Sequence, residues 1–131
     1  MRLSTLMLVK SIICLVFGGI FVLAPAALLA IYGVRNGDLS LLFMTRLYGA
    51  AFIVLGVLLW FAKNDTGSEA FRAIVLAVSI GDGVGFVVSL MGQLSNVMNG
   101  LGWSVVALYL LLTVGFGYAY LQLVKPSRRT A

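Results

Sequence analysis

Residues 11–34 read SIICLVFGGIFVLAPAALLAIYGV, a run of 24 uncharged and mostly apolar residues between Lys10 and Arg35. An α-helix needs roughly 20 such residues to cross the hydrocarbon core of a bilayer, so this run is long enough to span it. Pro25 lies within the run and predicts a kink or a loosened outer end, because proline lacks the amide hydrogen that a helix interior uses. A helix that is apolar on every side needs lipid as its solvent, and this requirement decides the fold class.

Three further apolar stretches follow, and with the first they predict membrane-spanning helices over residues 8–34, 41–62, 71–91 and 101–124. The chain is 62% hydrophobic and 10% charged, a balance that a soluble domain of this size cannot bury. Short polar segments separate the stretches, and short connections favour neighbouring helices that run in opposite directions. We therefore predict an all-α, integral membrane four-helix antiparallel bundle, with residues 1–131 as a single transmembrane domain.

The first run has a second interpretation. A positive N-terminal end, an apolar stretch and the sequence Ala24-Pro25-Ala26 are also the pattern of a signal peptide with a small-residue cleavage site. The apolar stretch continues through Tyr32, beyond the length of a typical signal core, so we expect the span to be retained. Cleavage would leave three helices.

The basic residues indicate the orientation in the membrane. Seven Lys or Arg residues lie on one side of the predicted spans and two on the other. The seven are Arg2, Lys10, Lys63, Arg72, Lys125, Arg128 and Arg129, and the two are Arg35 and Arg46. Because cytoplasmic loops carry the excess of Lys and Arg, we predict that both termini are cytoplasmic. Such an uneven count also disfavours a protein that inserts in both orientations.

The composition excludes several kinds of site. The chain has no histidine and one cysteine, so it lacks the commonest metal and haem ligand and has no cysteine pair for a disulfide. Paired carboxylates and nucleophile–base arrangements are also missing from the sequence, and we predict no catalytic residue, no cofactor and no metal site. The net charge of +5 is scattered near span ends and forms no basic stripe, so it does not indicate a nucleic-acid partner.

Asp82 interrupts the third span, about 15 Å into the membrane at 1.5 Å per residue. A carboxylate at that depth is costly unless it is protonated, paired or hydrated, so it is a candidate functional residue. Two roles stay open for Asp82: it is neutral or paired and fixes the packing of the helices, or it forms a site for an ion, a proton or a ligand. Arg46, near the outer end of the second span, is the predicted partner, unless it only caps the helix interface. Tyr48 and Tyr32 complete this candidate polar site with hydroxyl groups.

Glycines mark the positions where helices are expected to approach closely. Gly81 and Gly85 are spaced as a GxxxG motif, which lets a second helix pack against the first. The surrounding GDGVG sequence is not a phosphate-binding loop, because such a loop follows a strand and this segment lies within an apolar span. Gly49 and Gly56 are the corresponding packing positions in the second span.

A short span that opens RLYGA at residues 46–50 continues as LGVLLWF at residues 55–61 and is followed by a span with an acid. This pattern resembles the small bacterial four-helix membrane proteins grouped around the DoxX-like families. The resemblance implies a multi-pass protein of the bacterial inner (plasma) membrane with a helper role, and it identifies no reaction.

Two functions fit these observations, and both have the lipid bilayer as a partner. A non-catalytic accessory subunit, packed against other membrane-protein subunits or against a second copy as a homodimer, accounts for the glycine faces and the lack of catalytic groups. A small transporter, or a ligand- or proton-binding membrane module, accounts for Asp82. We favour the accessory subunit on sequence alone. A membrane enzyme has the weakest support.

Overall fold

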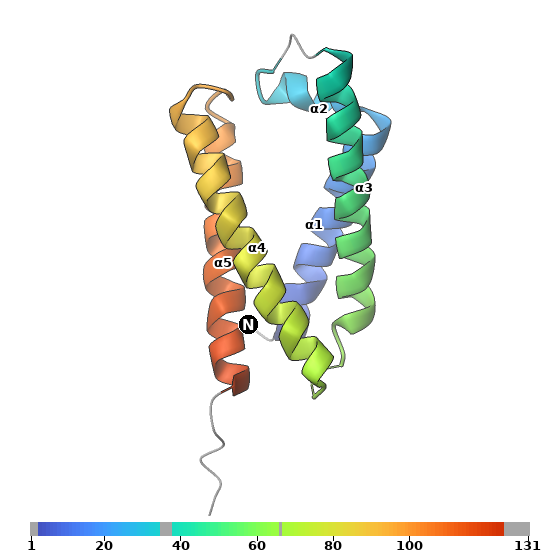
Figure 1. Ribbon diagram of the computed structural model, residues 1–131, viewed down its shortest axis with the longest axis vertical. Helices are drawn as coiled ribbons and strands as arrows, with labels where there is room; N and C mark the ends of the chain where they lie inside the picture. Colours follow the sequence, from blue (N-terminus) through green and yellow to red (C-terminus); the bar gives the residue numbers. More distant parts are fainter. Residues whose placement is uncertain (1–2, 35–37, 66, 125–131) are drawn as a thin grey trace, which may run out of the picture.

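The computed structural model describes residues 3–34, 38–65 and 67–124, and all secondary structure in that part of the chain is helical. Its five helices are α1 (Leu3–Leu23), α2 (Pro25–Ile31), α3 (Leu39–Ala62), α4 (Glu69–Leu94) and α5 (Gly102–Val124) (Figure 1). Four of these helices, all except α2, are long and apolar enough to cross a membrane. The structure therefore supports a membrane protein with four spans.

The first span differs from the prediction at both ends. α1 begins at Leu3 and stops at Leu23, and Pro25 is the first residue of the separate helix α2. The backbone leaves helical geometry at Ala24, where φ is −140° and ψ is 58°. Proline is tolerated in the first turn of a helix, because the amide there has no carbonyl partner, and it therefore starts α2. The earlier start of α1 places Lys10 inside the helix, about 10 Å from its first residue.

The long helices pack as two pairs. α1 lies along α3 and α4 lies along α5, whereas contact between the pairs is slight (Figure 1). In the first pair the backbones nearly touch at Gly18 and Gly49: a Cβ atom built on either would lie 2.8 Å from the carbonyl oxygen of the other. Gly56 similarly receives the side chain of Leu15. These close approaches hold α1 and α3 together as one unit.

The two pairs meet at both ends of the bundle. At one end, side chains from all four long helices form an apolar core, made of Met7, Leu59, Phe71, Val75, Val78, Leu112 and Phe116. At the other end, Asn99 in the α4–α5 connection donates from its backbone to Tyr32 O at 2.9 Å and from its side chain to Ile31 O at 3.0 Å. These two contacts tie the second pair to the end of α2. The candidate site lies between the two ends.

Candidate functional site

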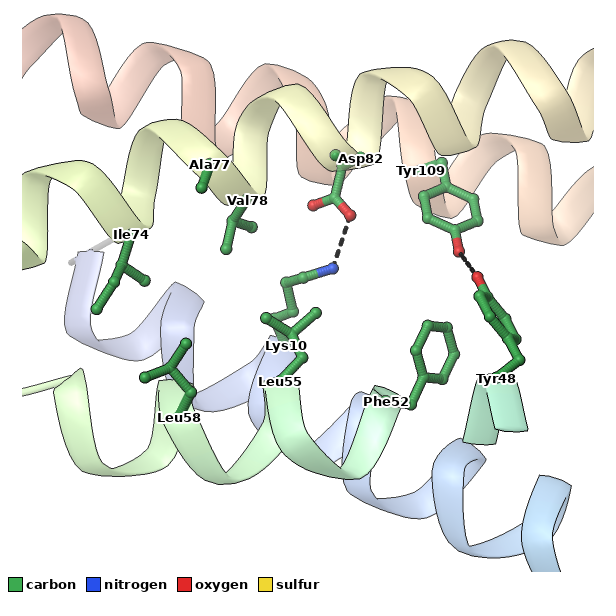
Figure 2. A pocket seen from close by; sticks show the side chains of 11 residues that line it. Lys10, Tyr48, Phe52, Leu55, Leu58, Ile74, Ala77, Val78, Asp82 and Tyr109 are labelled. Atoms are coloured by element: carbon green, nitrogen blue, oxygen red, sulfur yellow. Dashed lines mark hydrogen bonds and ion pairs between the residues drawn. The ribbon is translucent and has the colours of Figure 1, made fainter. Parts of the chain in front are cut away.

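A buried ion pair joins the two helix pairs. Nζ of Lys10 on α1 lies 2.7 Å from Oδ1 of Asp82 on α4, and each side chain is only 6% exposed (Figure 2). Both charged groups have therefore left solvent almost completely. Such a pair is favourable only when the attraction and further hydrogen bonds offset the cost of desolvation.

Helical spacing places both residues of the pair on inward faces. The buried residues of α1 recur every three or four positions and are Met7, Lys10, Ser11, Cys14 and Gly18. Those of α4 follow the same spacing and are Phe71, Val75, Val78 and Asp82, with Gln93 further on. Residues three and four apart share one face of a helix. Lys10 and Asp82 thus lie on the faces through which the two pairs meet.

Arg46, the predicted partner of Asp82, is not its partner in the structure. It is exposed on α3, one residue beyond the buried Thr45, and one residue turns the helix by about 100°. Lys10 was missed because it borders a charge-free run and was interpreted as the membrane boundary. The spacing of three and four residues from Met7 to Lys10 and from Lys10 to Cys14 is the signal that would have placed it on the inward face.

Two tyrosines form a second polar link between the pairs. The hydroxyl oxygens of Tyr48 on α3 and Tyr109 on α5 are 2.7 Å apart and share a hydrogen bond (Figure 2). Tyr48 also packs against Phe52, with 4.4 Å between ring centroids. The sequence prediction included Tyr48 but not Tyr109, because aromatic residues near span ends are typical of the interfacial belt.

Two apolar cavities adjoin these polar links. The larger has a volume of about 560 Å³ and the smaller about 280 Å³. Lys10, Tyr48, Phe52 and Tyr109 line both cavities, whereas Asp82 lines only the smaller one. Tyr32, the remaining residue of the predicted polar site, lines the larger cavity.

The two glycines of the predicted GxxxG motif have different surroundings. Gly85 lies against the ring of Tyr109, so a side chain there would displace the ring. Gly81 is exposed and borders the smaller cavity, and a Cβ atom on it would meet nothing within 4 Å. Of these two glycines, therefore, only Gly85 serves a close helix contact among the described residues.

The ion pair leaves hydrogen-bonding capacity unused. Oδ2 of Asp82 is buried and has no hydrogen-bond partner among the described residues. An ammonium group has three hydrogens to donate, and within the same residues Nζ of Lys10 donates one hydrogen bond, to Asp82. Asp82 lines the smaller cavity, although its Oδ2 is covered by protein atoms, and Lys10 brings unused donor hydrogens to the walls of both cavities.

No family model, curated protein or solved structure matches the chain. The function must therefore be inferred from the geometry of the site. That geometry combines apolar clefts with a few polar groups whose hydrogen-bonding capacity is incompletely used, and this combination suits binding of a small molecule.

Proposed function

We propose that this chain is a small multi-pass membrane protein that binds a small molecule between its two helix pairs. The observation that carries the proposal is the Lys10–Asp82 ion pair beside two apolar cavities, of which Lys10 lines both and Asp82 lines the smaller. A buried ion pair adds little stability compared with apolar residues of the same size, so stability alone is a poor reason for its presence. The larger cavity, at about 560 Å³, also falls within the usual range of small-molecule sites.

We further propose that the spans alternate in direction and that both termini are cytoplasmic. Because Lys10 lies inside α1, it no longer counts as a boundary charge, and seven basic residues on one side become six. By the same criterion Arg46, which lies seven residues into α3, also drops out, and the other side keeps only Arg35. Six against one is still the bias that places the richer side in the cytoplasm.

A second candidate is the accessory subunit, and the exposed surface around Gly81 favours it. An open glycine on a membrane helix admits a close neighbouring helix, and the described chain leaves this position unfilled. The resemblance to DoxX-like proteins of the bacterial plasma membrane supports the same role. In this case the partner is another membrane subunit or a second copy of the chain.

Native mass spectrometry of the gently solubilised, tagged protein tests both proposals. A monomer or dimer that retains a small molecule supports the binding function, provided that the molecule is lost from the Lys10→Met/Asp82→Leu variant. A larger complex with defined protein partners, or a dimer that retains no small molecule, supports the accessory subunit. A monomer that retains no small molecule contradicts both proposals.

A further inference from the structure

The larger cavity has a chemical character that narrows the class of ligand, and this inference rests on the proposed binding function. Its described lining is mostly apolar and contains Lys10 but no carboxylate. The other polar groups are hydroxyls and the Cys14 thiol, and the hydroxyls belong to Tyr32, Tyr48, Ser89, Ser104 and Tyr109. The cavity therefore presents one strong donor group, the ammonium, among weaker groups.

The ammonium of Lys10 needs acceptors. The residue is 4% exposed, and among the described residues Nζ donates only to Oδ1 of Asp82. Leaving a donor of a charged group unsatisfied in apolar surroundings is costly. A ligand that brings an acceptor oxygen to Nζ would remove this cost.

The charge balance at the site selects a neutral ligand. Lys10 and Asp82 together carry no net charge. An anionic ligand would add a buried negative charge close to the Asp82 carboxylate, and a cationic one would meet the Lys10 ammonium. Either excess charge is unfavourable beside a mostly apolar lining. A neutral acceptor gains the hydrogen bond without this expense.

We propose that the larger cavity binds a neutral single-chain lipid with an ester carbonyl, which accepts a hydrogen bond from Nζ of Lys10. The hydrocarbon chain would lie along the apolar wall, which includes Phe17, Phe21 and Leu108, toward Val97 and Met98. The carbonyl sets the position of the lipid head, and the apolar wall accommodates chains of different length.

Three probes with similar chains separate the alternatives: methyl decanoate, decanoate and decane. Each is partitioned between nanodiscs that contain the full chain and empty nanodiscs at pH 8, where decanoate is ionised. We expect saturable binding of the ester, with decane at least about tenfold weaker, since it lacks a hydrogen bond to a charged group that is worth that factor or more. Decanoate should also bind more weakly than the ester, because its charge would be left in excess beside the neutral ion pair. A ¹³C-labelled ester carbonyl should also show an infrared stretch shifted to lower wavenumber in the bound state.

The Lys10→Met/Asp82→Leu variant removes the donor without leaving an unpaired charge. Its affinity for the ester should fall about tenfold, to that of decane, and the infrared shift should disappear. Lys63→Met is the matched control, because Lys63 lines neither cavity, and it should bind the ester like the unmodified chain. The comparison of the three probes on the unmodified chain stands even if the double variant fails to fold.

Equal binding of ester and decane, tighter binding of decanoate, or an unchanged infrared shift in a folded double variant would each overturn the proposal. If the ester fails but native mass spectrometry finds another retained small molecule, the ligand class is wrong and the binding function stands. If neither is found, both are wrong.

Discussion

Removal of one or both charges of the Lys10–Asp82 pair gives the sharpest test of the structure. Lys10→Met leaves the Asp82 carboxylate buried without its cation, and Asp82→Leu leaves the ammonium without its anion. Losing one partner of a buried pair costs about 3–5 kcal/mol, and at 6% exposure of each side chain solvent does little to reduce that cost. The double variant removes both charges and should be as stable as the unmodified chain, or more stable by up to about 4 kcal/mol.

The free energy of unfolding can be measured in bicelles by steric trapping, or by denaturation with sodium dodecyl sulfate followed through Trp60 and Trp103 fluorescence. Single costs of about 3 kcal/mol or more each and a neutral double variant together require a coupling energy of at least about 6 kcal/mol between the two sites. Arg46→Met is the matched control for charge removal, because Arg46 is exposed, and it should change stability by no more than about 0.5 kcal/mol.

Two results would refute the reasoning. If each single substitution costs less than about 1 kcal/mol, the charges are not buried against each other as the structure has them. If the double variant costs the sum of the single variants, the two side chains act independently and the pair does not form.

Three further predictions concern packing and helix ends, and the same unfolding assay measures the first two. Gly18→Ala should cost about 1–3 kcal/mol, because the new Cβ would lie 2.8 Å from a backbone oxygen of α3. Gly19→Ala, whose Cβ meets nothing within 4 Å, should be neutral or stabilising by up to about 1 kcal/mol, because alanine is the better helix former. Tyr109→Phe removes the 2.7 Å hydrogen bond to Tyr48. A double-mutant cycle with Tyr48→Phe should give a coupling energy of about 0.6 kcal/mol. A coupling energy of zero would mean that the hydroxyls do not interact. Ser68→Ala removes the side-chain cap of α4 and should cost about 1 kcal/mol of local stability. Amide hydrogen exchange in the first turn of α4 should become faster accordingly. Unchanged exchange rates would contradict the cap.

The sequence predicted the existence of four long apolar helices because hydropathy over some twenty residues is a strong signal. It also placed the last three spans within three residues of the helices α3, α4 and α5. The first span was predicted less well, because the interruption at Ala24 depends on local backbone geometry that an average over a long window conceals. The position of Lys10 was predicted wrongly for a similar reason, because a single charge next to a long apolar run is typical of the end of a membrane span.

The sequence could predict one residue of the buried ion pair, Asp82, but not its partner. Asp82 stood out because a charge within an apolar run is costly wherever its helix packs. Its partner depends on which helices pair, and hydropathy contains no information about that. The assembled helix pairs bring Lys10 of α1 to Asp82 of α4, whereas Arg46 of α3 is exposed. Tyr109 was missed for the same reason, since its role appears only when α5 faces α3.

Asp82 follows Lys10 by 72 positions in the chain, so the two charges are also separated in time during synthesis. At about 5–20 residues per second, a ribosome needs roughly 4–14 s to make the intervening chain. A helix that enters the bilayer as it is made must therefore hold its lysine in the membrane without a counter-charge, at an insertion cost of about 2.5–3.5 kcal/mol near the helix centre. α1 has a high mean hydropathy, 2.5 over its most apolar window. Its affinity for lipid can therefore offset the cost of the buried lysine until α4, with Asp82, has been inserted.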